Sequence, residues 1–430
     1  MSQACFGRAP WNGKNALVLI ANETSWPACL FVLKILIKQI IKLEKQEDPQ
    51  IMTSKASPHL KTFTGDSDDF RFHHYLDLVC GVSTGGIIAT MLGHLRLSLE
   101  ETVTRITDVL GSVPPAIPKQ LILRQEYSSQ IHARLHDKME PKRFKLLLRS
   151  CNSPQDACQM KASPFLSVPG MCQTLVLGAR ERTPSKVYVF RSYRLPEVID
   201  SDFASMHKTG APVPLVNVCR IAMANPRYRE HVKAYLEAHG REEHMVGAAN
   251  NIDFARLIAE EVQSAYTRTG RLQYLLEIGS RPKKSLSSWR SCWPFNKAQS
   301  DRKRLEVKST MTPKDFEHVQ IGNLNELAGY VRSKSTAEAE EYCLAQGLYD
   351  KLDSCARVLV ESRRARASTI EWEIFAFSDR YLCSVCRKEG HKIDILDKPA
   401  FLDHVDFVHD FYDLEPPEMF KIQKESRVEL

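Results

Sequence analysis

Several kinds of segment are missing from this chain of 430 residues, and each absence argues against a class of protein. It contains no run of about 18 apolar residues, so we expect no membrane-spanning helix. Residues 1–14 lack an apolar core, so we expect no signal peptide. Neither a phosphate-binding P-loop nor the glycine fingerprint of dinucleotide-binding folds is present. These absences argue against a nucleotide hydrolase and against a dinucleotide-dependent enzyme.

A strong charge of one sign is also missing. The 59 lysines and arginines exceed the 52 acidic residues by only 7, which does not require nucleic acid but allows an anionic membrane surface. Twelve cysteines occur without a secretory signal, so we expect reduced thiols and a metal site rather than disulfides. We therefore expect a cytoplasmic protein, with a nuclear location also open.

Short apolar runs alternate with amphipathic stretches along the first 280 residues. Strands are predicted at residues 15–20, 75–80, 172–178, 186–190 and 272–279. Helices are predicted at residues 29–44, 102–110, 125–148, 215–224 and 254–266. This alternation is typical of an α/β fold with helices layered on a sheet.

The most informative motif is Gly81-Val82-Ser83-Thr84-Gly85, which follows the strand expected at 75–80. The apolar residues 87–92 then predict the start of a helix. A strand, a sharp turn and a helix would lift Ser83 clear of the sheet, beside backbone N–H groups such as that of Thr84. The motif predicts acyl transfer, with Ser83 as the nucleophile that forms an acyl-enzyme. The alternative is a glycine-rich turn whose serine has no catalytic role.

With these residues, the chain resembles patatin-like phospholipases, in particular the fungal kind. The resemblance covers roughly residues 14–335 and is strongest in the elbow segment. Weaker support comes from residues 172–193, 218–226, 247–255 and 275–280. The resemblance implies a three-layer α/β/α sandwich that hydrolyses acyl esters of lipids through a Ser–Asp dyad, without histidine.

The chain departs from this family in the loop that would stabilise the oxyanion. The family pattern D-G-G-G-x-R-G corresponds here to residues 20–26, which contain neither glycine nor arginine. Glycine lets backbone N–H groups approach and point at an oxyanion. Glu23 instead brings a negative charge to that place. The loss of one oxyanion donor typically lowers the rate by a factor on the order of 10²–10³.

The aspartate of the family dyad is also replaced. An ungapped count from Asn250-Asn251 places His244 at its position. Histidine has a suitable pKa for a general base, and a shifted Glu243 is an alternative. The simplest interpretation of residues 241–244 is a charged surface cluster. We therefore expect a serine acyl hydrolase by descent with weak or lost activity, or else an inactive module that binds lipid or protein.

Residues 281–304 differ in character from the rest of the chain. They hold eight lysines and arginines against one acid, with Trp289, Trp293 and Phe295 between them. Cations and tryptophans together favour a membrane interface, although a solvated loop is the alternative. Residues 336–370 follow as a predicted helical connector.

A second motif lies in the predicted C-terminal unit, residues 371–430. Cys383 and Cys386 are followed after seventeen residues by His404 and His409, a spacing similar to that of a C2H2 zinc finger. His391 could replace one histidine, and four unrelated residues are the other alternative. The predicted helix is acidic, so we expect a structural or protein-binding zinc site rather than one that binds nucleic acid. A zinc-dependent regulatory protein with the α/β domain as scaffold is a third interpretation.

Overall fold

The structure of the chain is a computed structural model that describes part of the sequence. The described residues are 13–22, 24–47, 70–110, 165–167, 170–180, 183–193, 204–205, 213–224, 232–236, 241–248, 252–266, 270–280, 306–311, 316–322, 324–333, 336–367, 369, 372–377, 379–389, 398–409, 422 and 425–429. The predicted helix at 125–148, the basic segment 281–304, Asn250-Asn251 and His391 lie outside them.

A ten-stranded sheet forms the centre of the described structure, in the order β5-β4-β3-β2-β1-β8-β10-β9, with β7 and then β6 attached to β3. The strands are β1 (Gly13–Ala21), β2 (Leu78–Ser83), β3 (Gln173–Arg180), β4 (Thr183–Arg191), β5 (Ala204–Ser205), β6 (Val232–Leu236), β7 (Arg241–Gly247), β8 (Arg271–Ser280), β9 (Glu306–Met311) and β10 (Glu317–Gly322). The five central strands, β3-β2-β1-β8-β10, are parallel. The α/β class expected from the sequence is confirmed.

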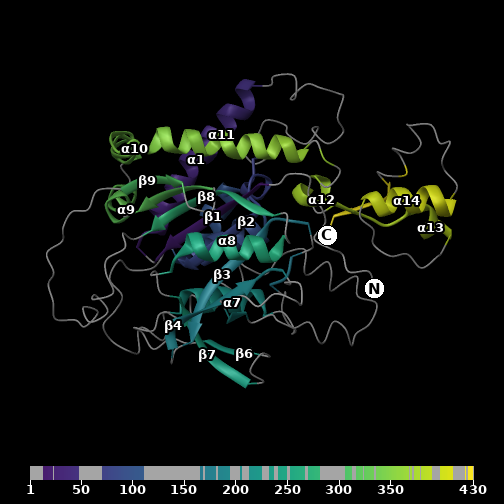
Figure 1. Cartoon of the computed structure of the whole chain (residues 1–430), viewed down its shortest axis with the longest axis horizontal. Helices are drawn as coiled ribbons and strands as arrows, with labels where there is room; N and C mark the ends of the chain where they lie inside the picture. The colour runs from purple at the N-terminus through teal and green to yellow at the C-terminus, as the bar shows by residue number, and fades with distance from the viewer. Residues whose placement is uncertain are drawn as a thin grey trace.

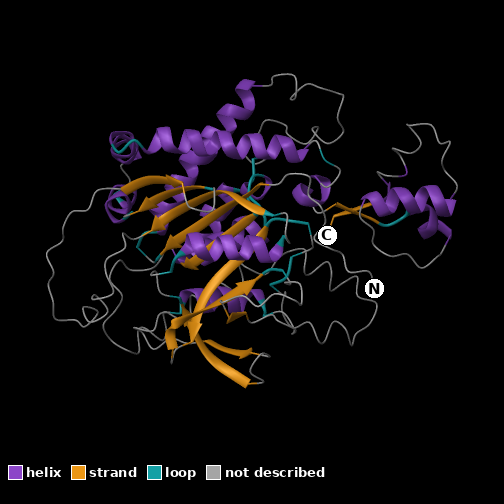
Figure 2. Cartoon of the chain, in the orientation of Figure 1, coloured by secondary structure: helices purple, strands orange, loops and turns teal. Residues whose placement is uncertain are grey.

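Helices cover both faces of this sheet (Figures 1 and 2). They are α1 (Trp26–Glu47), η2 (Phe72–His74), α2 (Thr84–Ala89), the π-helix η3 (Thr90–His94), α3 (Leu99–Leu110), α7 (Leu215–Met223), α8 (Phe254–Ala265), α9 (Asn325–Arg332), α10 (Thr336–Ala345), α11 (Leu348–Ala367) and α12 (Trp372–Phe377). A separate group near the C-terminus comprises β11 (Asp379–Tyr381), α13 (Ser384–Glu389), α14 (Lys398–His409) and β12 (Arg427–Glu429). In Figure 1, α13 and α14 lie to one side of the sheet.

Strand β1 shows how the sequence builds the two apolar layers. Leu17 and Leu19 belong to the cluster that contains α1, α2, α7 and α11. Ala16, Val18 and Ile20 face the opposite cluster, under α8. Because side chains alternate along a strand, an apolar run of this kind requires cover on both sides of the sheet.

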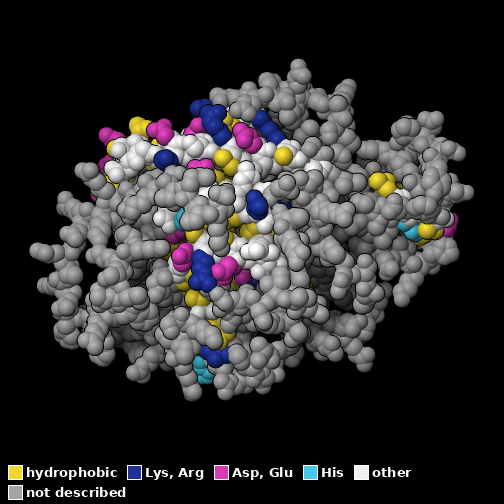
Figure 3. Space-filling model, in the orientation of Figure 1, with side chains coloured by type: hydrophobic (Ala, Val, Ile, Leu, Met, Phe, Trp, Pro, Cys, Tyr) yellow, Lys and Arg dark blue, Asp and Glu magenta, His cyan; other side chains and the backbone are white. Residues whose placement is uncertain are grey.

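The predicted connector at 336–370 consists of α10 and α11, which separate at Gly347. This glycine has a φ of 66°, a left-handed conformation that commonly ends a helix. Buried residues of both helices, including Cys343 and Leu352, belong to the same apolar cluster as α1. On the face of the molecule shown in Figure 3, the positive and negative side chains of the described residues are intermixed, so this face carries no patch of a single charge.

A buried ion cluster holds the end of α11 against the sheet. Asp77, just before β2, accepts a hydrogen bond from the backbone N–H of Asn15 at 2.8 Å and pairs with Arg366. The Lys14 Nζ lies 3.5 Å from Asp77 Oδ1, and the side chains of all three charged residues are at most 3% exposed. Lys14 also lies over the Tyr266 ring, 4.5 Å from its centroid.

Helix α12 packs against a pair of buried histidines in η2. The His73 Nε2 lies 3.1 Å from the carbonyl oxygen of Ala376, and the ring of His74 lies 5.7 Å from that of Trp372. Burial, followed by the charges of nearby arginines, lowers the pKa of His74 to about 3. Burial and the neighbouring His74 also lower the pKa of His73. Both histidines are therefore neutral in the folded protein near pH 7.

This pair makes the protein sensitive to mild acid. The folded pKa values lie below the ordinary value of 6.5, so the unfolded chain takes up protons first as the pH falls below about 6.5. We expect the free energy of unfolding to fall by up to about 1.4 kcal/mol per pH unit for each histidine. Urea unfolding between pH 7.5 and 5 measures this slope, and the double variant His73→Phe, His74→Phe should flatten it. An equal slope in that variant would contradict the assignment.

Among the helices in the described part of the chain, none combines the length and apolar character needed to cross a membrane.

Candidate active site and metal centre

Ser83 lies at the turn between β2 and α2 and is partly exposed. Its backbone has a φ of 53° and a ψ of −132°, which residues other than glycine rarely adopt. Only one other non-glycine residue among those described, Arg96, has a positive φ. Such a conformation costs about 1–3 kcal/mol and is typical of functional turns. The strand predicted at residues 75–80 lies three residues later, as β2 (Leu78–Ser83), and the turn and helix predicted after it are present, with Ser83 in a strained backbone conformation.

The two glycines of the motif are required by close packing of the backbone. A Cβ atom on Gly81 would lie 2.2 Å from the carbonyl oxygen of Gly85. A Cβ atom on Gly85 would lie 2.2 Å from the carbonyl oxygen of Leu19 in β1. The first turn of α2 is thus pressed against both β2 and the end of β1. Only glycine at these positions lets the turn form.

The loop after β1 differs from an oxyanion loop because its N–H groups are already used. The Asn22 Oδ1 accepts hydrogen bonds from the backbone N–H groups of Thr24 and Ser25, at 3.0 and 2.9 Å. The backbone N–H of Asn22 donates to the Ser25 Oγ at 3.0 Å. This reciprocal arrangement is a capping box at the start of α1. These three backbone donors are therefore satisfied within the loop and do not face a substrate.

This role of Asn22 was not among the predictions from the sequence. The sequence carries only part of a capping signal, because asparagine is a favoured capping residue but the residue three positions later is Ser25 rather than the usual Glu or Gln. Thr84, whose N–H was predicted to hold the oxyanion, is the buried first residue of α2. The first N–H groups of a helix have no partner within the helix, so this donor remains consistent with the prediction.

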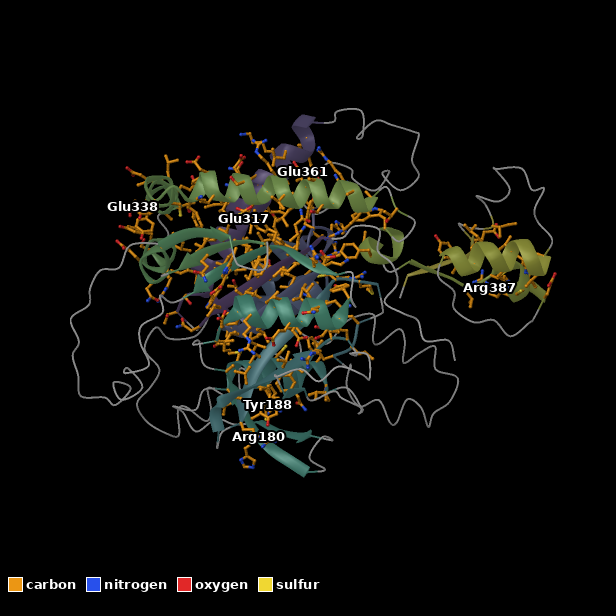
Figure 4. The ribbon with its side chains drawn as sticks, in the orientation of Figure 1. Arg180, Tyr188, Glu317, Glu338, Glu361 and Arg387 are labelled. Atoms are coloured by element: carbon orange, nitrogen blue, oxygen red, sulfur yellow. The ribbon has the colours of Figure 1, made fainter. Side chains whose placement is uncertain are left out.

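The structure does not bring His244 to Ser83. Strand β2 pairs with β3 only as far as Leu177. Strand β7 pairs with the next residues of β3, so that Gly247 lies opposite Gly178. His244 precedes Gly247 by three residues in β7, which separates the two residues by about 10 Å along the strand. Its side chain is exposed. Next to it in β7, Met245 is paired with Arg180, whose guanidinium lies 4.9 Å from the centre of the Tyr188 ring at this end of the sheet (Figure 4).

No general base can be assigned from the described residues. Ser83 Oγ makes no hydrogen bond within the part of the chain that the structure describes, and the side chain of Glu243 lies outside that part. In the part of the chain that the structure describes, the elbow therefore lacks the dyad acid and the glycine loop that the resemblance to patatin-like phospholipases implies.

The four predicted metal ligands do come together. One potential ligand atom from each of Cys383, Cys386, His404 and His409 lies within 4.8 Å of all the others. The Cys386 Sγ lies 3.3 Å from His404 Nε2 and 3.1 Å from His409 Nε2, and Cys383 Sγ lies 3.3 Å from His409 Nε2. A tetrahedral zinc ion with two thiolates and two imidazoles separates sulfur from nitrogen by about 3.5 Å. The ligand set therefore fits one metal ion, and zinc is the metal that this donor chemistry favours.

The surrounding elements differ from those of a C2H2 finger. Such a finger has two strands followed by a helix. Here Cys383 and Cys386 stand at the start of α13, both histidines belong to α14, and the second strand, β12, comes after α14 and pairs with β11. The order strand–helix–helix–strand makes the C-terminal residues part of the metal unit.

Ser426 connects this last strand to the cysteine pair. It is fully buried, and its Oγ accepts a hydrogen bond from the backbone N–H of Ser384 at 2.9 Å. Its carbonyl accepts another from the N–H of Leu382 at 2.8 Å. The rings of Tyr381 and Phe401 stack nearby, 4.8 Å apart. A small apolar core thus lies directly beside the ligands, with Arg387 of α13 on its surface (Figure 4).

Comparisons with known proteins do not identify a family for this chain. No family model matches the sequence, and no curated protein matches it. The interpretation of both sites therefore depends on their motifs and geometry.

Proposed function

We propose that the chain is a serine acyl hydrolase of patatin-like descent, a three-layer α/β/α enzyme that acts slowly on acyl esters of lipids. The observation that carries the proposal is the strained conformation of Ser83 between β2 and α2. A turn that needed only to be tight would accept glycine at this position at no conformational cost. Serine with a φ of 53° instead places a partly exposed side chain at the carboxyl end of the parallel strand β2. Folds with a parallel sheet bind ligands at the carboxyl ends of their strands.

The reaction proposed for this site is acyl transfer to Ser83. The serine oxygen bonds to the ester carbonyl carbon while the carbonyl electron pair moves onto oxygen, and the serine proton passes to solvent. When that pair returns, the bond to the alcohol breaks and the alcohol leaves with a proton. Water then releases the acyl group by the same steps. Without an assigned base, and with three loop donors used in the capping box, we expect turnover far below that of a complete dyad.

Labelling with a fluorophosphonate tests whether Ser83 is a nucleophile. We expect covalent labelling of the wild-type chain and none of Ser83→Ala, because the probe forms its phosphorus–oxygen bond only with an activated serine. Mass spectrometry of the labelled peptide identifies the site. Ser333→Ala, which removes an exposed hydroxyl at the end of α9, is the matched control and should label as the wild type does. A folded wild-type chain that stays unlabelled refutes the proposal.

The second candidate is an inactive module that binds lipid or protein through the same edge of the sheet. The specific observation in its favour is that the capping box replaces an oxyanion loop while His244 lies elsewhere. Vesicle binding that persists in Ser83→Ala, together with no labelling of the wild type, supports this candidate. In either case we propose that the C-terminal unit is a zinc-stabilised structural element.

A further inference from the structure

Asn22 is the first residue beyond β1, at the same edge of the sheet as the elbow. The preceding residue, Ala21, is the register partner of Ser83 in the parallel pair β1–β2. The backbones are close here, because a Cβ atom on Gly85 would lie 3.0 Å from the Ala21 nitrogen. The side chain of Asn22 is partly exposed. A carboxamide therefore lies beside the turn that carries the serine, at a position where the resembling family has glycine.

The orientation of this carboxamide is determined by its hydrogen bonds. The Asn22 Oδ1 accepts from the backbone N–H and the hydroxyl of Thr24, at 3.0 and 2.8 Å. It also accepts from the backbone N–H and the hydroxyl of Ser25, at 2.9 and 3.0 Å. A backbone N–H can only donate, so the accepting end must be the oxygen. The Nδ2 group thus occupies the opposite end, and within the described residues it has no hydrogen-bond partner.

The loop is also held from outside. The Arg332 guanidinium at the end of α9 donates to the carbonyl oxygen of Thr24. The hydrogen bonds to the Asn22 Oδ1 and the bond from Arg332 both hold the loop in place, so the Nδ2 group of Asn22 is oriented before a substrate binds. Pre-orientation is what makes an oxyanion donor effective, because no reorganisation is needed as the charge develops.

We propose that the Asn22 Nδ2–H group is an oxyanion donor, a side-chain substitute for the missing backbone donors. As the Ser83 oxygen attacks the ester carbonyl, the carbonyl oxygen gains the electron pair, and the Asn22 amide donates to it beside the N–H of Thr84. The same donor contacts the phosphoryl oxygen when Ser83 displaces fluoride from a fluorophosphonate. This inference rests on the proposed function and names a catalytic residue within it.

The variant Asn22→Asp separates the donor from the cap. Aspartate accepts the same four hydrogen bonds, and its charge suits the N-terminus of α1, so the loop is retained. It removes both N–H donors of the amide. We expect the rate of fluorophosphonate labelling at Ser83, and of p-nitrophenyl ester hydrolysis, to fall by about 10²–10³-fold. The melting temperature should stay at or above that of the wild type.

Asn325→Asp is the matched control for the added charge. Asn325 is the exposed first residue of α9, which follows β10 at the same edge of the sheet, and its substitution should leave labelling unchanged. If Asn22→Asp does not fold, Asn22→Ser keeps an accepting oxygen for the cap and should still slow labelling by about tenfold or more. Labelling of the folded Asn22 variants at the wild-type rate overturns the inference and leaves the nucleophile intact. An unlabelled wild type removes the proposed function as well.

Discussion

Replacing Cys383 with serine is expected to abolish stoichiometric metal binding and to unfold the C-terminal unit. The wild-type chain should contain about one zinc ion, because its four ligand atoms lie within 4.8 Å of one another. Binding of structural zinc is worth about 10–16 kcal/mol in finger peptides at pH 7. The apolar core of this unit has few members, among them Tyr381, Phe401 and Val405. A core of this size cannot order roughly 50 residues by itself.

Elemental analysis and limited proteolysis measure this effect. We expect zinc to be lost from Cys383→Ser and the segment around α13 and α14 to become sensitive to protease, while the sheet stays folded. Cys343→Ala is the matched control, since Cys343 is a buried thiol in α10, in a different apolar cluster. A metal-free wild-type chain that resists protease in this segment shows that the four side chains are only packed together.

Substituting Asp77 with asparagine is expected to cost about 3–5 kcal/mol of folding free energy. The change leaves Arg366, which is fully buried and cannot lose its proton, without its carboxylate, although its other contacts remain. Burial lowers the pKa of Lys14 while Asp77 opposes that shift, so the loss of the Asp77 charge lowers this pKa further and reduces the cost of the unpaired lysine. Most of the cost therefore comes from the arginine. Urea unfolding at pH 7 measures the loss.

Two comparisons control this prediction. Asp353→Asn breaks an exposed pair with Arg357 within α11 and should cost about 0.3–0.5 kcal/mol. The double variant Asp77→Asn, Arg366→Met removes both buried charges and should be more stable than Asp77→Asn alone. If the double variant is the less stable of the two, the carboxylate and the guanidinium are not coupled as the structure implies.

The features that the sequence predicted best are those set by neighbouring residues. The strand at 15–20, the turn at Ser83 and the helix after it follow from short apolar runs and glycine spacing. The cluster of two cysteines and two histidines was also predictable, because the chemistry of a tetrahedral metal site restricts the spacing of such residues.

Strand β10 shows why other elements were missed. Its sequence begins Glu317-His318-Val319-Gln320, which is too polar to suggest a central parallel strand. In the structure, His318 is buried and its Nε2 lies 3.0 Å from the Glu277 Oε2 of β8. Gln320 donates to the same carboxylate at 3.1 Å. Polar residues can occupy a buried strand when residues far away in the sequence form hydrogen bonds with their side chains.

The amino-acid sequence by itself determined the α/β class, the strand–turn–helix at Ser83 and the four residues of the candidate metal site, because each depends on local spacing. Only the tertiary structure decided where His244 lies, that Asn22 caps α1 beside the serine, and that β12 closes the metal unit. These depend on which strands pair and which faces they present. Such pairings join residues far apart in the chain, and their energies come from burial and hydrogen bonds that no local pattern contains.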